Sequence, residues 1–271
     1  MRIRVAVLVV VIQVAMSAAA GDWGLPIEGS MAEEFLENSE VISVRNFDTK
    51  AITRPKRVEL SNGELNCFAV FKTIEEYVPK KEFADGGNEL QFSDSYRYEI
   101  VAYELDKLLD IGIVPPAVER RIDGDVGSLS LWVEGSITEW ERLKERQIHP
   151  PDTEAWNNQM FTVRLFLQLI YDTDYQNVNN LLVTPDWKIY KIDSSRAFRT
   201  HKKLRNEEAL ERFSRPVLES LRNLTREELK ANLGMWLSKY QIQALWVRRG
   251  LILDLADRRI EEFGEDKVLF D

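Results

Sequence analysis

The stretch that decides the fold runs from Leu169 to Phe198 and reads LIYDTDYQNVNNLLVTPDWKIYKIDSSRAF. A loop rich in Asp and Asn comes first, followed by an apolar run at 181–183, a turn at 184–187 and an alternating run at 188–192. Pro and Asp favour turns, and short runs of Leu, Val, Ile and Tyr favour strands. The stretch therefore predicts a loop, a strand, a turn and a second strand that ends at Asp193.

Three side chains of this stretch are of the types that phosphoryl transfer requires, in the required order. Asp174 is a carboxylate that can receive a proton from a hydroxyl, Asn179 adds an amide oxygen five residues later, and Asp193 is a second carboxylate. The two strands return Asn179 and Asp193 to one edge, a geometry suited to a shared divalent cation. The alternative is that the Asp and Asn residues of 172–180 only form turns.

Composition excludes several classes of function. With 271 residues, of which 44% are hydrophobic, the chain can bury a large core and is not a disordered protein. The net charge of −9 argues against a nucleic-acid partner, which would need clustered Lys and Arg. Cys67, His149 and His201 are the only cysteine and histidines, so a zinc site and a Cys-His pair are disfavoured and an intramolecular disulfide is excluded.

The first residues predict an export signal. Met1–Arg4 is basic, Val5–Met16 is apolar, and Ser17–Ala20 supplies the small residues that signal peptidase requires, so we expect residues 1–20 to be removed. An uncleaved membrane anchor is the alternative, but Gln13 interrupts a stretch already shorter than the ~20 apolar residues of a spanning helix. We expect an exported protein, periplasmic, extracellular or in a secretory lumen, with no stable membrane span after the signal is removed.

Strand patterns begin after residues 21–54, which we interpret as an N-terminal arm. The run at 57–60 alternates, the run at 67–72 is apolar, and the turn at 61–64 contains Asn-Gly, so these residues predict a β-hairpin. In a nucleotide-binding sheet this turn would lie over the phosphates. It lacks a GxGxxG pattern, and an ordinary hairpin turn is an equal alternative.

Lys72 ends the strand AVFK and can point from the sheet into a cleft, where it would meet the α- and β-phosphates of a nucleotide. A lysine that reaches solvent is the alternative. After a polar loop at 80–88, a helical pattern from Ser93 or Ser95 to residue 110 places Glu99 in its first turns, where it can hold Lys72. Glu104 is the other possible partner.

The rest of the chain predicts two more strands and then helices. Runs at 117–121 and 128–134 are joined by an Asp-Gly turn, and a helix that begins after Asp152 or Thr153 leads to the Asp- and Asn-rich loop. A basic patch at 199–205 could contact phosphates or an acidic substrate, or could be a solvated face.

The order of these side chains resembles the atypical branches of the protein-kinase superfamily. Phe71-Lys72, the segment EIVAYELD at 99–106 before VPP at 114–116, and IDSSRAF at 192–198 are similar to secretory-pathway kinases related to Golgi casein kinase. The last two segments and 174–179 are also similar to phosphatidylinositol 3-/4-kinase-like proteins, in particular to type II phosphatidylinositol 4-kinases. The resemblance covers about residues 55–200.

This resemblance implies an α+β fold with two lobes that bind ATP between them. A small β-rich N-lobe with one long helix would span 55–135, and a mostly helical C-lobe would span 136–271. It also implies a role for each site residue. Lys72 would order the phosphates, Glu99 would position Lys72, Asp174 would be the base, and Asn179 with Asp193 would bind Mg²⁺ or Mn²⁺; the connector at Leu131, Trp132 and Val133 would bind adenine through its backbone. Asn180 is the alternative amide, because it directly precedes Leu181-Leu182.

The sequence departs from that family at three places. Tyr175 stands where arginine usually follows the catalytic aspartate, Ser194-Ser195 replaces a small polar-glycine pair, and Cys67 has no disulfide partner although the secretory kinases are held by disulfides. We expect an exported ATP-dependent kinase that transfers the γ-phosphoryl group to a hydroxyl on an unidentified protein, lipid or small molecule. The alternatives are a pseudokinase that binds a nucleotide or a partner without turnover, and a lipid or small-molecule kinase.

Overall fold

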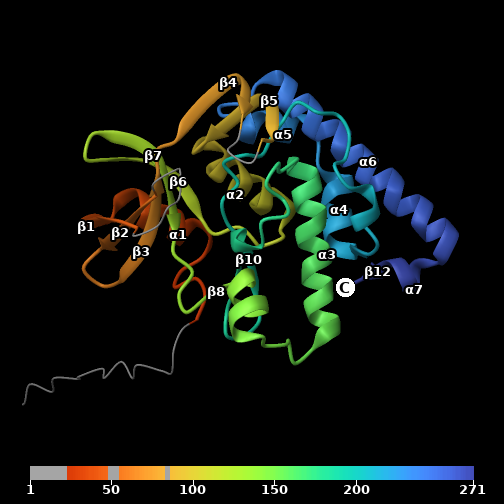
Figure 1. Ribbon diagram of the computed structural model, residues 1–271, viewed down its shortest axis with the longest axis horizontal. Coiled ribbons are helices and arrows are strands. Elements are labelled where there is room, and N and C mark those ends of the chain that lie inside the picture. Colours follow the sequence, from red (N-terminus) through yellow and green to blue (C-terminus); the bar gives the residue numbers. More distant parts are fainter. Residues whose placement is uncertain (1–22, 48–54, 83–85) are drawn as a thin grey trace, which may run out of the picture.

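The computed structural model describes residues 23–47, 55–82 and 86–271, so the predicted signal at 1–20 lies outside the described residues. A five-stranded antiparallel sheet lies at one end of the molecule, and helices fill the other end (Figure 1). In spatial order its strands are β1 (Glu40–Asn46), β2 (Lys56–Ser61), β3 (Asn66–Lys72), β7 (Asp125–Leu131) and β6 (Ala117–Ile122).

The alternation of buried and partly exposed residues explains why β2 and β3 form strands of this sheet. On β2, Val58 and Leu60 face the core, and on β3, Ala69 and Phe71 do so, while the residues between them are partly exposed. Each of the larger of these side chains contributes roughly 1.5–3 kcal/mol by leaving water. The core between the sheet and helix α1 (Gly29–Asn38) forms in this way, and the strands predicted at 57–60 and 67–72 are confirmed.

Strand β1 and helix α1 lie within the region that the sequence analysis assigned to an N-terminal arm. The strand pairs with β2 from Glu40 to Asn46, with an irregularity between Val41 and Ser43, and so forms one edge of the sheet. Its residues are exposed or partly buried, which explains why the apolar alternation of a core strand is missing from this part of the sequence.

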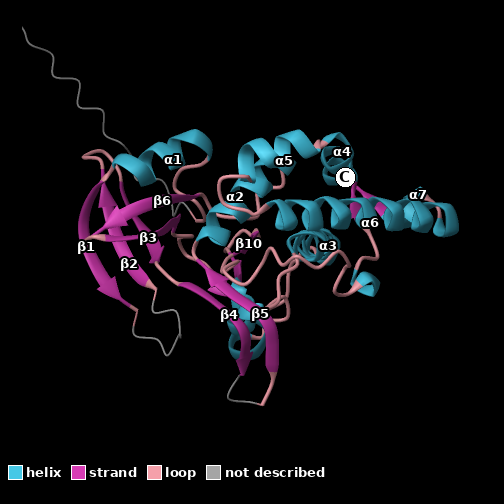
Figure 2. Ribbon diagram, turned by 90° about the horizontal axis from the view of Figure 1, so that it is seen from above, coloured by secondary structure: helices cyan, strands magenta, loops and turns pink. Residues whose placement is uncertain are grey.

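A second hairpin separates β3 from helix α2 (Arg97–Leu109) and projects away from the five-stranded sheet (Figure 2). Its strands β4 (Glu75–Glu82) and β5 (Asn88–Ser95) pair only with each other among the described strands. The prediction of a loop over 80–88 is therefore wrong at both ends, because 80–82 belong to β4 and residue 88 begins β5. Charged residues on both faces of β4, together with Pro79, hide the strand pattern from sequence reasoning.

Helix α3 (Thr153–Ile170) delivers the Asp- and Asn-rich loop. The Asp152 side chain accepts hydrogen bonds from the backbone N–H groups of Glu154 and Ala155, an N-cap worth about 1 kcal/mol. The helix ends at Tyr171, which has a left-handed backbone (φ +52°). Beyond it the chain turns through the short 3₁₀ helix Val178–Asn180 into β9 (Leu181–Val183) and β10 (Ile189–Lys191), as the sequence predicts.

The remaining elements build the helical end of the molecule. They are β8 (Ile137–Thr138), the π-helix Glu141–Arg146, the 3₁₀ helix Glu207–Ala209, β11 (Phe213–Ser214), α4 (Arg215–Asn223), α5 (Arg226–Leu233), α6 (Lys239–Phe263), α7 (Glu265–Val268) and β12 (Leu269–Phe270). One large apolar core joins α2 and α3 to α4, α5 and α6. No helix within the described ranges is both long and apolar enough to cross a membrane.

Candidate active site

Lys72, Glu99 and Asp193 meet at one point, although they come from three separate elements. Lys72 is the last residue of β3, Glu99 lies in the first turn of α2, and Asp193 follows β10. The Lys72 ammonium lies 2.8 Å from Glu99 Oε1 and 3.0 Å from Asp193 Oδ1. Glu104 instead pairs with Lys107 at 3.0 Å. Of the two partners that the sequence offered for Lys72, the fold places Glu99 beside it.

Backbone contacts fix the loop that carries Asp193. The Ser194 N–H donates to Glu99 Oε2 at 3.0 Å, the Ser195 hydroxyl donates to Asp193 Oδ1 at 3.0 Å, and the Ser95 N–H donates to the Ser195 carbonyl at 2.9 Å. Asp193 itself has a left-handed backbone (φ +58°), a conformation that costs energy for a residue with a Cβ and is tolerated better by Asp than by bulkier residues. The start of α2 and the Asp193 loop therefore form one connected unit.

Electrostatics favour the charged forms of Asp193 and Lys72, whereas burial raises the pKa of the Glu99 carboxyl despite its contact with Lys72. Burial opposes the charged form of Asp193, but attraction to Lys72, with hydrogen bonds from Lys72 and Ser195 and a contribution from Lys191, outweighs burial and holds the pKa of the Asp193 carboxyl below its ordinary value. Burial also opposes the charge of Lys72, yet the two carboxylates raise its pKa above the usual lysine value. Lys72 is therefore a permanent cation at neutral pH.

A cavity of about 480 Å³ opens beside Lys72. Its polar wall includes Lys72, Glu99 and Asp193, and much of the remaining wall is apolar, with Val70, Leu131, Trp132, Val133, Ile137 and Leu182. Flat apolar walls beside a few charged groups are typical of small-molecule sites. Leu131, Trp132 and Val133, which the sequence analysis assigned to a connector, all line it.

The connector is held by backbone hydrogen bonds beside the cavity. The N–H groups of Leu131, Trp132 and Glu134 donate to the carbonyls of Pro116, Phe68 and Gly24. Val133 lies between two of these donors and lines the cavity, as Pro115 does.

The cavity also shows which end of the sheet lies near it. Phe47 and Pro55, at the two ends of the β1–β2 connection, line the cavity, and the Phe47 ring stacks on Trp132 with centroids 5.8 Å apart. The exposed turn at 61–64, between β2 and β3, does not line it. The interpretation of that turn as a phosphate loop is therefore wrong, and its Asn-Gly is an ordinary hairpin turn.

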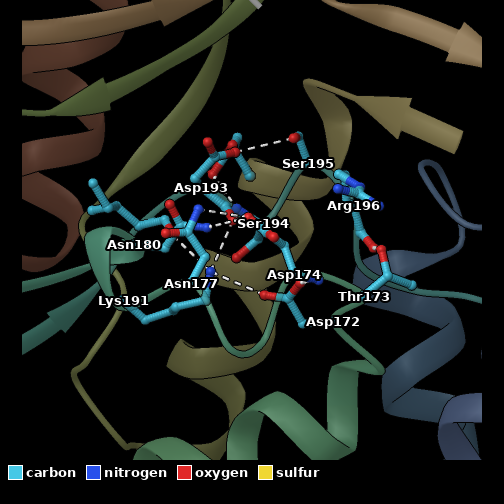
Figure 3. Close-up of polar contacts among 12 residues, drawn as sticks. Asp172, Thr173, Asp174, Asn177, Asn180, Lys191, Asp193, Ser194, Ser195 and Arg196 are labelled. Atoms are coloured by element: carbon cyan, nitrogen blue, oxygen red, sulfur yellow. Dashed lines mark hydrogen bonds and ion pairs between the residues drawn. The ribbon is translucent and has the colours of Figure 1, made fainter. Parts of the chain in front are cut away.

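Asp174 lies in a network of amide groups (Figure 3). Its Oδ2 accepts hydrogen bonds from Asn177 Nδ2 and Asn180 Nδ2, both at 2.9 Å. Asn180 is buried, whereas Asn179 is exposed and lines the cavity that Asp193 also lines. The two amides that the sequence left as alternatives thus have different surroundings: Asn180 holds Asp174, and Asn179 faces the cavity.

Sequence reasoning missed Asn177 as a member of the site. Its side-chain oxygen accepts from the Asn179 N–H at 3.2 Å, so it caps the 3₁₀ helix, while its amide nitrogen orients Asp174. The only sequence signal was its turn-forming residue type, which does not distinguish a structural Asn from a functional one.

The donor groups present fit a divalent cation. The ion pair and the hydrogen bond found for the Asp193 carboxylate within the described residues both go to Oδ1, which leaves Oδ2 for another partner. Hard cations such as Mg²⁺ prefer carboxylate and amide oxygens, which Asp193 and Asn179 offer on one cavity. Over the described ranges, no three His, Cys, Asp or Glu side chains are grouped to hold a metal ion alone.

Comparison with solved structures identifies the class of fold. Neither a protein-family model nor a curated protein matches the sequence. Solved structures do match, and they give the chain a mixed α/β, kinase-like fold of the kind found in secretory-pathway kinases.

Two of these structures are a hydra Fam20 solved with sugar and the Golgi casein kinase. The first is 15% identical, covers 88% of this chain and 90% of its own, and has a TM-score of 0.62. The second is 14% identical, covers 89% of this chain and 78% of its own, and has a TM-score of 0.61. At this identity the likeness establishes the fold and leaves the activity to be argued from the site.

Proposed function

We propose that the protein is an exported kinase that passes the γ-phosphoryl group of ATP to a hydroxyl on an acceptor. The observation that carries the proposal is the contact of the Lys72 ammonium with both Glu99 and Asp193 at the wall of a cavity of about 480 Å³. A cation, its orienting carboxylate and a further carboxylate at one cavity are the groups that position a nucleotide and its metal in kinases. The kinase-like fold supports the same conclusion.

The proposal assigns two lobes that meet at the connector. Strands β2, β3, β6 and β7 and helix α2 would lie in the N-lobe, 55–135, with β1 added from the preceding arm, and helices α3 to α7 would lie in the C-lobe, 136–271. Adenine would bind against the apolar wall and the Val133 backbone, and the phosphates would extend toward Lys72. The sheet and α1 have an apolar core of their own, whereas α2, which lies within 55–135, packs into the core of the helical end.

Each site residue then has a chemical role. Lys72 binds the α- and β-phosphates and Glu99 keeps its ammonium in place, so little reorganisation is needed when the nucleotide binds. Asp193 Oδ2, with the amide of Asn179 or Asn180, would hold Mg²⁺ or Mn²⁺, which supplies charge neutralisation at the β- and γ-phosphates. Asp174 accepts the proton of the acceptor hydroxyl, and Asn177 and Asn180 keep its carboxylate in position.

The acceptor would approach from the side of Thr173. A second cavity there is lined by Thr173, Tyr171, His201 and Arg205 and by the β4–β5 hairpin. It lies next to Asp174 along the chain, whereas the nucleotide cavity lies on the side of Asp193. The acceptor class, whether protein, lipid or small molecule, remains part of the proposal to be tested.

Export is proposed from the leader at 1–20, and one structural neighbour is named for the Golgi. The test of function is to incubate the secreted protein with γ-labelled ATP and Mn²⁺, alone and with pools of secreted proteins, lipids and sugars. We expect label on the protein itself or on one acceptor class. If nucleotide with metal stabilises the fold but no label is transferred, the chain is a nucleotide-binding pseudokinase. If neither occurs, the proposal is wrong.

A further inference from the structure

A second buried ion pair joins Lys191, which lines the nucleotide cavity, to Asp172. Lys191 is the last residue of β10, and Asp172 lies just after the C-terminal end of α3. The Lys191 ammonium lies 3.1 Å from Asp172 Oδ2, and the two side chains are only 2% and 0% exposed (Figure 3). Taking two charges out of water is costly, and replacing such a pair with apolar residues is often neutral or stabilising. Stability alone therefore does not explain why this pair is present.

Each partner also binds the backbone of a loop that carries a site residue. Asp172 Oδ1 accepts from the Asp174 N–H at 2.8 Å. The Lys191 ammonium donates to the carbonyl of Ile192 at 2.6 Å and to the carbonyl of Asp193 at 2.8 Å. A continuous polar chain thus runs from the backbone of Asp174, through the ion pair, to the backbone of Asp193.

The backbone of Asp193 needs such support. Its left-handed conformation (φ +58°) persists only where the surroundings hold it. Lys191 holds its carbonyl, while Lys72 and Ser195 hold its carboxylate. The conformation that aims Asp193 at the cavity therefore depends on a lysine whose charge is balanced by the other loop.

We propose that Asp172 and Lys191 are positioning residues that couple the loop of Asp174 to the loop of Asp193, so that the base and the metal-binding carboxylate keep one relative geometry. The catalytic part of this inference rests on the proposed function. The coupling itself is a property of the free protein and can be measured without ATP.

The chain contains a matched control pair. Glu139 and Arg142 form another buried ion pair, with both side chains 5% exposed and nitrogen-oxygen distances of 2.6 and 2.8 Å. Arg142 also donates to a backbone carbonyl, that of Ile148. Neither side chain lines the nucleotide cavity. Breaking this pair imposes the same kind of electrostatic cost without touching either site loop.

The first experiment measures hydrogen exchange of the nucleotide-free protein by mass spectrometry, in Asp172→Ala, Lys191→Met and the double variant. We expect reciprocal effects: Asp172→Ala speeds exchange at least fivefold at 193–195, and Lys191→Met does so at 172–177. The variants Glu139→Gln and Arg142→Met should leave both segments as in the wild type. Faster exchange confined to the mutated loop, or equal effects from the control pair, would overturn the coupling.

The second experiment measures phosphotransfer. A single substitution leaves one buried charge unpaired and can prevent folding, so the double variant Asp172→Ala/Lys191→Met, which buries no charge, is decisive. We expect kcat to fall at least tenfold, the KM for ATP to stay within about threefold, and more Mn²⁺ to be needed for half-maximal rate. Lys191→Arg, which keeps the cation and its donors, should retain more of kcat than Lys191→Met.

The control double variant Glu139→Gln/Arg142→Met should keep kcat within about twofold. A folded Asp172→Ala/Lys191→Met protein with wild-type kcat and wild-type Mn²⁺ dependence refutes the positioning role. If the wild type transfers no phosphate, the proposed function fails, and the exchange experiment still decides whether the two loops are coupled.

Discussion

The two halves of the site are built in different ways. Lys72, Glu99 and the Asp193 loop are joined by contacts between residues 27 and 95 positions apart, so only the complete fold brings them together. The network around Asp174 is local, with its hydrogen bonds spanning two to six positions. A local turn of Asp and Asn can form in many proteins. The long-range meeting of a lysine with two carboxylates at a cavity is therefore the more specific sign of function.

The largest effect is expected at the long-range half. Asp193→Asn removes the charge that would face the cation, so we expect kcat/KM for phosphotransfer to fall by about a thousandfold or more. Rates measured at saturating Mn²⁺ test this. The control is Asp186→Asn, at an exposed position in the turn between β9 and β10, and it should leave kcat/KM unchanged. An Asp193→Asn protein with more than a tenth of wild-type activity would contradict the role assigned to the long-range half of the site.

A substitution in the local half of the site should lower the rate of the chemical step and leave nucleotide binding unchanged. Asp174→Asn keeps an oxygen that can accept from Asn177 and Asn180 but removes the base, so we expect kcat to fall about a hundredfold or more. Because Asp174 does not line the nucleotide cavity, the KM for ATP should change little. Steady-state kinetics separate the two parameters, and a loss that appears only in KM would contradict the assignment.

Substitutions of Asn179 and Asn180 should have different kinds of effect on the reaction. Asn179→Ala should raise the Mn²⁺ concentration needed for half-maximal rate several-fold, because Asn179 faces the cavity. Asn180→Ala should instead lower kcat by about tenfold at saturating Mn²⁺, because Asp174 loses a hydrogen bond. Metal titrations of both variants decide the matter. The reverse pattern would make Asn180 the metal ligand.

The smallest effect expected is on stability, and it depends on pH. In the wild type the folded pKa of Asp193 is lowered, so its contribution is complete above its unfolded value of about 4 and is lost as pH falls below that value. Lys72→Met removes the cation between the buried Glu99 and the partly exposed Asp193 and, by leaving Glu99 unpaired, should cost about 3 kcal/mol at pH 7.

The pKa of Glu99 is already raised by burial in the wild type, and loss of Lys72 should raise it further. Lys72→Met should therefore recover more stability than the wild type as the pH is lowered from 8 to 5. Denaturant unfolding at several pH values tests this. Lys81→Met, which removes a partly exposed hairpin lysine, is the control. A parallel pH profile for the wild type and Lys72→Met would show that the centre is not electrostatically coupled.

Much of the fold could be predicted because local patterns decided it. Strands β2 and β3, helix α3 and the β9–β10 hairpin follow apolar periodicity and caps. The β4–β5 hairpin was missed because two strands that pair only with each other bury too little to create an apolar alternation. Strand β1 was missed because it forms the edge of the sheet and its residues are exposed or partly buried.

The site residues also divide into those that could be predicted from local sequence patterns and those that could not. Lys72 could be selected because it ends an apolar strand, Asp193 because it follows one, and Glu99 because it lies in the first turn of a helix. The roles of Asn177 and of the Asp172–Lys191 pair could not, because their partners are set by how α3, the loop and β10 meet in space. Residue type gave no signal that separates a turn former from a residue that supports the site.

The most direct test of the central claim is equilibrium binding of ATP to the wild-type protein and to Asp193→Asn, measured by calorimetry with and without Mn²⁺. We expect the wild type to bind ATP at least tenfold more tightly when Mn²⁺ is present, and Asp193→Asn to lose this gain. No binding by the wild type, or equal binding with and without the metal in both proteins, would contradict it.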